Sequence, residues 1–168
     1  IRELTEGTLD VAIVATPLHE KHLIERPLYY EPFVAYIPNA KYHLTENQKI
    51  KVSDLHLNDI LMLQDGHCFR ESVLNICQEN GSSDKGKDNS LEIKSGSFET
   101  LIKLANEGMG MTLLPYLHTL DLSEEEKKNL HYFEEPSPAR EISLLYHSNE
   151  LKISIIDALY NVISGVIR

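Results

Sequence analysis

The 168-residue sequence has few basic residues, only two cysteines and no long apolar run. No stretch approaches the roughly 20 apolar residues that a membrane-spanning helix needs, and the first residues lack the basic region and apolar core of a signal peptide. Sixteen basic residues against 26 acidic ones give a formal net charge of −10, the wrong sign for a surface that neutralises nucleic-acid phosphates. We therefore expect a cytoplasmic chain that makes no membrane contact and does not bind DNA through these residues.

The scarcity of cysteine excludes a structural disulfide framework, because a reducing compartment keeps ordinary thiols reduced. Any disulfide here would be a redox event. His19 and His22 have helical i, i+3 spacing, but no third ligand accompanies them, so we expect no metal. The stretch 108–111 lacks the third glycine of a dinucleotide fingerprint and precedes a strand, so it predicts a turn and no bound cofactor.

Helix-like and strand-like segments alternate along the chain, and 42% of the residues are hydrophobic, enough for a core in one domain or two small lobes. This alternation predicts an α/β fold with a mainly parallel sheet. The first strand, a mostly apolar run, is expected to be buried on both faces. The expected strands are 9–15, 33–37, 60–63, 91–94, 111–114 and 142–146, and the expected helices are 69–79, 98–106, 123–129 and 153–167.

The last of these helices is expected to bury one apolar side. That side comprises Ile155, Ile156, Leu159, Val162, Ile163 and Val166. At the other end of the chain, residues 1–6 resemble the end of a helix closed by Gly7, so we expect earlier elements to precede them. Prolines near 32 and 136–138 lie between strand-like runs, where we expect the chain to cross between two lobes.

The run 65–71 places Cys68 at a turn from a strand into a helix. The positive end of the helix dipole, Arg70 and a protonated His67 all favour the thiolate, which is the form that attacks peroxide. A lone cysteine near a helix start is nevertheless more often inert than reactive. The run alone therefore leaves both interpretations open.

Cys77 follows nine residues later on the apolar face of the same predicted helix. Free cysteine is among the most buried residue types, so core filling is one interpretation. A reactive thiol with a second thiol within reach of a modest rearrangement is also typical of a redox sensor with a resolving cysteine. The pair is more informative than either cysteine by itself.

Several motifs resemble the effector domain of LysR-type transcription regulators and together cover almost the whole chain. They are Leu4-x-x-Gly7-x-Leu9-Asp10-Val11-Ala12-Ile13, Pro27-Leu28-x-x-Glu31-Pro32, and the stretches 97–101 and 108–115. The resemblance implies two Rossmann-like lobes similar to a type 2 periplasmic binding protein, with the N-terminal part of the domain missing from this chain. Residues 1–31 and 139–168 would form part of lobe I, and residues 32–138 would form lobe II with both cysteines. A winged helix-turn-helix domain that binds DNA is expected upstream.

The run 61–70, with a cysteine nine residues further on, resembles the peroxide-responsive OxyR group of that family. This resemblance implies that hydrogen peroxide oxidises Cys68 to a sulfenic acid, which then forms a disulfide with Cys77 and changes how a homodimer or tetramer associates on DNA. It also implies that His67 and Arg70 assist the thiol and that Arg140 lies near it. A thiol reductant such as glutaredoxin or thioredoxin would reset the sensor, which is not expected to be an enzyme.

The chain departs from the OxyR pattern at Glu71, where an aspartate is usual, and at Phe69, where leucine is usual. Glu71 is still expected to support the site. Glutamate in place of aspartate affects the expected hydrogen bonds around the thiol, not the redox role of the cysteines. A family threonine that helps bind peroxide would lie upstream of residue 1. Two alternatives stay open: an effector domain that binds a small metabolite, with incidental cysteines, and a thiol peroxidase, although no feature supports catalysis in cycles.

A disulfide between the two cysteines would conflict with the predicted helix. Nine residues at a rise of ~1.5 Å span about 13 Å. Bonded cysteines instead need Cα atoms within roughly 7 Å of each other. The sequence therefore predicts that oxidation unwinds part of the helix 69–79.

Overall fold

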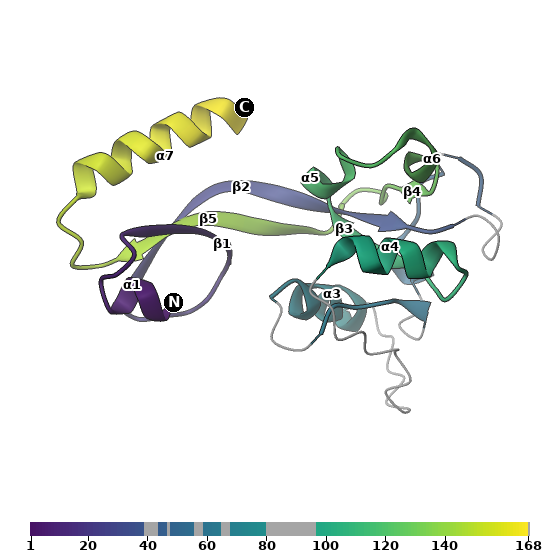
Figure 1. The fold of residues 1–168 in the computed structure, drawn as a ribbon, viewed down its shortest axis with the longest axis horizontal. Helices are drawn as coiled ribbons and strands as arrows, with labels where there is room; N and C mark the ends of the chain where they lie inside the picture. Colours follow the sequence, from purple (N-terminus) through teal and green to yellow (C-terminus); the bar gives the residue numbers. More distant parts are fainter. Residues whose placement is uncertain (39–43, 47, 56–58, 65–67, 80–96, 168) are drawn as a thin grey trace. The chain divides into compact units, whose positions relative to one another are not determined.

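The computed structural model describes residues 1–38, 44–46, 48–55, 59–64, 68–79 and 97–167 (Figure 1). The chain forms two compact units: unit 1 comprises residues 1–31 and 139–168, and unit 2 comprises residues 32–138. Unit 2 is therefore an insertion within unit 1. Among the described residues, no helix has the length and apolar character needed to cross a membrane.

Unit 1 combines two helices with strands from both ends of the chain. Its elements are α1 (Arg2–Thr5), β1 (Val11–Thr16), the first part of β2 (Leu23–Tyr36), β5 (Ala139–His147) and α7 (Ile153–Ile167). β5 lies between β1 and β2, and β1 pairs antiparallel with β5 from Val11 opposite Tyr146 to Thr16 opposite Glu141. Gly7 follows α1 with φ of +73°, a left-handed conformation that suits glycine, so the predicted helix end is confirmed.

The burial predicted for two elements of unit 1 is wrong. In β1, Ile13 is 54% exposed, although its neighbours Ala12 and Val14 on the other face pack against the small core of Leu4, Leu23 and Leu145. In α7, the row that packs on the sheet is Ile156 with Tyr160 and Ile163. Apolar side chains that point away from this row remain exposed, because a helix presents one stripe at a time to a flat sheet: Ile155, Leu159, Val162 and Val166.

Unit 2 is built on the last residues of β2. Phe33 to Tyr36 pair antiparallel with β3 (Thr112–Pro115), and Ala35 and Tyr36 pair with β4 (Leu130–His131). Its helices are η1 (Val52–Asp54), α3 (Cys68–Glu79), α4 (Phe98–Asn106), α5 (Tyr116–Thr119) and α6 (Glu124–Lys127). They surround a core in which the β2 residues from Phe33 to Tyr36 are at most 2% exposed.

The prediction of a mainly parallel sheet is wrong for the described strands. The chain leaves unit 1 along β2 and returns along β5, so these neighbouring strands run in opposite directions, and β1 also pairs antiparallel with β5 (Figure 1). Parallel contacts occur at two isolated bridges, Ile50 with Phe133 and Ile60 with Met111. The expected strand 60–63 is thus buried but forms isolated bridges, at Ile60 and Met62, in place of a strand, and the expected strand 91–94 lies outside the described residues.

A close backbone contact fixes the segment that leads into α3. The Met111 amide donates to the Asp59 carbonyl at 2.8 Å, and the Leu61 amide donates to the Met111 carbonyl at 2.7 Å. Gly110 permits this approach, because a Cβ at that position would lie 2.4 Å from the Asp59 carbonyl oxygen. The segment 59–63 is therefore held against the strand that begins at Thr112.

Candidate functional site

Both cysteines belong to one helix, α3, which begins at Cys68 and ends at Glu79. This confirms the helix predicted over 69–79, and it places Cys68 at the helix start and Cys77 in the last turn. A position at the start of a helix lies next to its positive dipole end, which favours an anion. The side chains of Cys68 and Cys77, and all of His67, lie outside the described residues.

Aromatic and aliphatic side chains anchor the first turns of α3 in the core of unit 2. Phe69 and Val73 are each 2% exposed. The Phe69 ring lies 5.2 Å from that of Phe33 in β2 and 4.9 Å, edge to face, from that of Phe98 at the start of α4. Any movement of the first turn of α3 therefore disturbs both β2 and α4.

Arg70 connects α3 to the segment that precedes it. Its guanidinium, in a residue only 9% exposed, donates through Nη1 to the Leu63 carbonyl at 3.4 Å. The neighbouring Glu71 is exposed in the first turn of the helix. Both residues thus stand within three positions of Cys68, and their predicted support of the thiol remains a prediction.

Arg140, at the start of β5, forms an ion pair with Glu31, the last residue of unit 1 along β2. The Arg140 Nε and Nη2 atoms donate to the same Glu31 carboxylate oxygen at 2.9 and 2.7 Å. The side chains of Arg140 and Glu31 are 18% and 4% exposed, so the ion pair is largely buried. The two residues meet because β2 and β5 are neighbours in the sheet. That Arg140 lies near Cys68 remains a prediction.

Sequence reasoning missed a cluster of hydroxyl groups around Glu141 in unit 1. Tyr30 donates to Oε2 of Glu141 at 2.8 Å, and Thr16 donates to Oε1 at 2.8 Å, with Ser143 3.2 Å from Oε1. These bonds, led by that from Tyr30, lower the pKa of Glu141, and the same contact raises the pKa of Tyr30. No local motif signals the cluster, because Thr16 and Glu141 are 125 residues apart.

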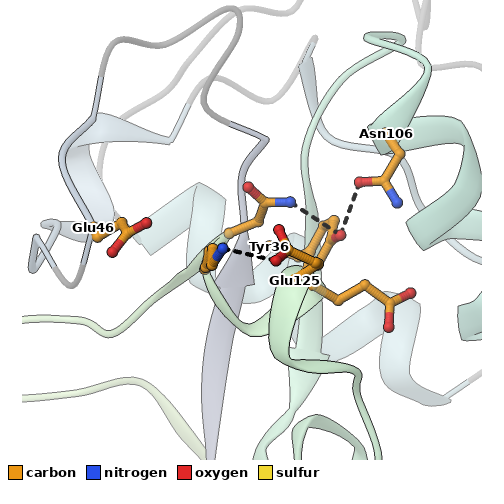
Figure 2. A pocket seen from close by; sticks show the side chains of 7 residues that line it. Tyr36, Glu46, Asn106 and Glu125 are labelled. Carbon is orange, nitrogen blue, oxygen red and sulfur yellow. Dashed lines mark hydrogen bonds and ion pairs between the residues drawn. The ribbon is translucent and has the colours of Figure 1, made fainter.

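A pocket of about 310 Å³ opens in unit 2 and was likewise missed (Figure 2). Its lining includes the Tyr36 side chain at the end of β2, Asn106 at the end of α4 and Asn129 after α6. Carboxylates and one lysine complete the lining: Glu46, Glu125, Glu126 and Lys128. The residues come from four separate segments, so no local pattern could have indicated the pocket.

Potential metal ligands do not gather in the described part of the chain. No group of three or more His, Cys, Asp or Glu side chains there could hold an ion. His19 and His22 are exposed, and the His22 ring lies 6.4 Å from that of His147. Two imidazoles without further ligands do not make up a structural or catalytic metal site.

Comparison with known proteins identifies the family. The profile of the LysR substrate binding domain matches residues 1–166, so the chain belongs to the LysR substrate-binding domain family. The α/β fold resembling a periplasmic binding protein, which the sequence predicted, is confirmed by this match and by the structures of OxyR regulatory domains.

Within that family the chain is similar to peroxide-responsive regulators. It is 32% identical over 149 residues to the Escherichia coli K12 "DNA-binding transcriptional dual regulator OxyR", covering 87% of this chain and 46% of that protein. It is 31% identical over 145 residues to the "probable hydrogen peroxide-inducible genes activator" of Mycobacterium leprae, covering 86% of this chain and 45% of that protein. The chain spans about half the length of these curated relatives, whose names are those of regulators and not enzymes.

A solved structure extends the similarity to three dimensions. The crystal structure of reduced OxyR from Porphyromonas gingivalis matches with a TM-score of 0.79 and 27% identity, covering 98% of this chain and 73% of that one. The similarity therefore includes both units of the chain.

Proposed function

We propose that this chain is the redox-sensing regulatory domain of a hydrogen-peroxide-responsive transcription regulator, which switches through a reversible disulfide between Cys68 and Cys77. The observation that carries the proposal is the placement of both cysteines in one helix, α3, whose first turn is anchored in the core. The peroxide-inducible activators among its relatives support the same function. DNA binding through an upstream domain and assembly as a homodimer or tetramer belong to this proposal.

The proposed chemistry is a two-electron oxidation. The Cys68 thiolate attacks one oxygen of hydrogen peroxide, the O–O bond breaks, and hydroxide leaves and is protonated to water, so that Cys68 becomes a sulfenic acid. The Cys77 sulfur then attacks the Cys68 sulfur and displaces a second hydroxide, which also becomes water. Two thiols and one peroxide thus give one disulfide and two waters. A dithiol reductant such as glutaredoxin or thioredoxin reverses the step.

Polar groups near the helix start favour the reactive form of Cys68. The α3 dipole places partial positive charge there, and Arg70 adds a fixed positive charge within the same turn. His67 and Glu71 flank these positions in the sequence. Cys77 has no such advantage, because the C-terminal end of a helix carries partial negative charge and disfavours a thiolate. We therefore assign peroxide attack to Cys68 and the resolving step to Cys77.

The continuous helix between the cysteines makes oxidation a conformational event. Nine helical residues separate the two Cα atoms by about 13 Å along the axis, and a disulfide requires roughly 7 Å or less. Oxidation therefore has to break intervening turns of α3. Phe69 and Val73, which pack in the core, oppose this unwinding and would be displaced by it.

Mass spectrometry with two cysteine variants tests the proposal. Mild peroxide should remove two hydrogens per chain from the parent protein. Cys77→Ser should still react but proceed to the sulfinic acid, because no thiol traps the sulfenic acid, whereas Cys68→Ser should not react on the same timescale. Titrated alkylation at neutral pH should label residue 68 before residue 77. Equal labelling, or unchanged oxidation of Cys68→Ser, would show that the roles are assigned wrongly.

A further inference from the structure

The pocket in unit 2 has a polar floor at the buried Tyr36 hydroxyl, beside the partly buried side chain of Asn129 and the exposed side chain of Asn106. Tyr36 is 0% exposed, and its hydroxyl donates to Oδ1 of Asn106 at 2.8 Å and accepts from Nδ2 of Asn129 at 3.2 Å. The three residues belong to β2, the end of α4 and the segment after α6. The hydroxyl therefore fixes both carboxamides in place.

Each carboxamide uses only one of its polar atoms on Tyr36. Nδ2 of Asn106 and Oδ1 of Asn129 have no hydrogen-bond partner among the described residues, although both side chains line the pocket. The floor thus offers one donor and one acceptor, already oriented, beneath a cavity of about 310 Å³. This volume lies at the lower end of the range found for small-ligand sites.

The charges around the pocket favour a cation. Three of its lining residues are glutamates and one is a lysine. Lys128 is already paired with Glu125 at 2.8 Å, and Glu126 accepts hydrogen bonds from Ser123 that lower the pKa of its carboxyl. Glu46 forms no close ion pair with a described residue, although, after Glu125, its charge contributes to the raised pKa of Lys128. Figure 2 shows a dashed line between Asn106 and the Tyr36 hydroxyl, with Glu46 drawn farther from them.

The end of a helix adds to the negative electrostatic potential of the pocket. α4 comprises nine residues and ends at Asn106, so its C-terminal end, which carries partial negative charge, lies at the pocket floor. An anionic ligand would meet this end and an excess of carboxylates. A ligand with N–H donors would instead find two acceptors, the Glu46 carboxylate and the side-chain oxygen Oδ1 of Asn129.

We propose that this pocket binds a small aliphatic ammonium compound, with the ammonium group on Glu46 and Asn129 and a second polar group on Asn106. The site is separate from α3 and does not depend on the cysteines. The domain would then respond to a small metabolite as well as to peroxide.

A series of four-carbon compounds that differ in charge tests this site. The probes are 1,4-diaminobutane, 4-amino-1-butanol, 1,4-butanediol and succinate, titrated into the reduced protein at constant ionic strength. Affinity should fall in that order, with the diamine at least about tenfold tighter than the diol, and succinate should not bind. In proton–nitrogen NMR spectra, the side-chain amide signals of Asn106 and Asn129 should shift with the diamine.

A matched pair of charge-removing variants separates a site from general attraction. Glu46→Gln should weaken diamine binding about tenfold, and because Glu46 is exposed the protein should remain folded. Glu20→Gln removes the same charge from an exposed position in unit 1 and should leave the affinity unchanged. Equal affinity for diamine and diol, unshifted Asn106 and Asn129 signals, or equal weakening by both variants would overturn the proposal.

Discussion

A single glycine controls how closely the segment before α3 packs. A Cβ at residue 110 would lie 2.4 Å from the Asp59 carbonyl oxygen, and a backbone atom cannot move aside as a flexible side chain can. Gly110→Ala should therefore separate the hydrogen-bonded segments at Asp59 and Met111. We expect a loss of about 1–3 kcal/mol in the free energy of unfolding, measured by urea denaturation.

Gly165 in α7 is the control for this substitution. A Cβ there meets no atom within 4 Å. Gly165→Ala should be neutral or should stabilise the protein by up to about 1 kcal/mol, because alanine favours the helix over glycine. If both variants lost the same stability, the contact at Asp59 would not be the cause.

The hydroxyl cluster around Glu141 predicts an acid-sensitive contribution to stability. The hydrogen bond from Tyr30 is the largest cause of the lowered pKa of Glu141. A carboxyl whose pKa is lower in the folded state stabilises the fold above its unfolded pKa, and this stabilisation is lost as the pH falls through the folded pKa. Tyr30→Phe should raise the pKa of Glu141 toward its unfolded value, so that the acid-dependent loss of stability from this carboxyl becomes smaller and is complete at a higher pH.

Carbon-13 NMR titration of the Glu141 carboxyl measures that shift directly. Tyr30 is 67% exposed, so its substitution should leave the core intact. Tyr132→Phe, at another exposed tyrosine outside the cluster, serves as the control and should leave the pKa of Glu141 unchanged. An unchanged pKa in Tyr30→Phe would refute the role given to this hydroxyl.

At the scale of elements, α3 is expected to be the part that oxidation changes. Amides between residues 69 and 79 should be protected from hydrogen exchange in the reduced protein, because α3 is helical and anchored through Phe69 and Val73. They should lose protection when the disulfide forms. Hydrogen exchange followed by mass spectrometry on reduced and oxidised protein gives the comparison.

Two other helices provide internal references for that experiment. The amides of α7, in unit 1, should exchange equally in both states, and those at the start of α4 should change only near Phe98, which contacts Phe69. Unchanged protection across α3, in protein whose disulfide is confirmed by mass, would exclude unwinding of this helix as the switch.

Helices could be predicted from the sequence because their signals are local. Apolar spacing indicated α3, α4 and α7, and Ser123 with three acidic residues indicated α6, whose capping box the structure shows. Strand pairing could not be predicted, because Val11 meets Tyr146 from the far end of the chain. Nor does periodicity decide which of two apolar rows of α7 faces the sheet.

The same distinction applies to the candidate sites. The two cysteines lie nine residues apart, so they could be identified as a candidate redox pair from the sequence alone. The pocket instead joins Tyr36, Asn106 and Asn129, and only the three-dimensional arrangement of β2, α4 and the segment after α6 brings them together.

At the scale of the whole molecule, unit 2 is expected to fold without unit 1. The described buried residues of its core all lie within 32–138. A protein comprising only these residues should show a single cooperative transition in urea, followed by circular dichroism. A gradual, non-cooperative loss of signal would mean that unit 2 requires unit 1 for its stability.

The insertion of unit 2 also fixes an order of assembly. The Phe33 amide donates to the Pro138 carbonyl at 2.9 Å, so the two ends of unit 2 meet when it is folded. If unit 1 formed first, bringing β2 and β5 together would close an unstructured loop of about 110 residues, at an entropic cost of about 4 kcal/mol beyond a constant. If unit 2 folds first, the hydrogen bond between Phe33 and Pro138 already holds the two ends of this loop together, and the cost of closing it has been met. Nascent chains should therefore complete the inserted unit before the outer one.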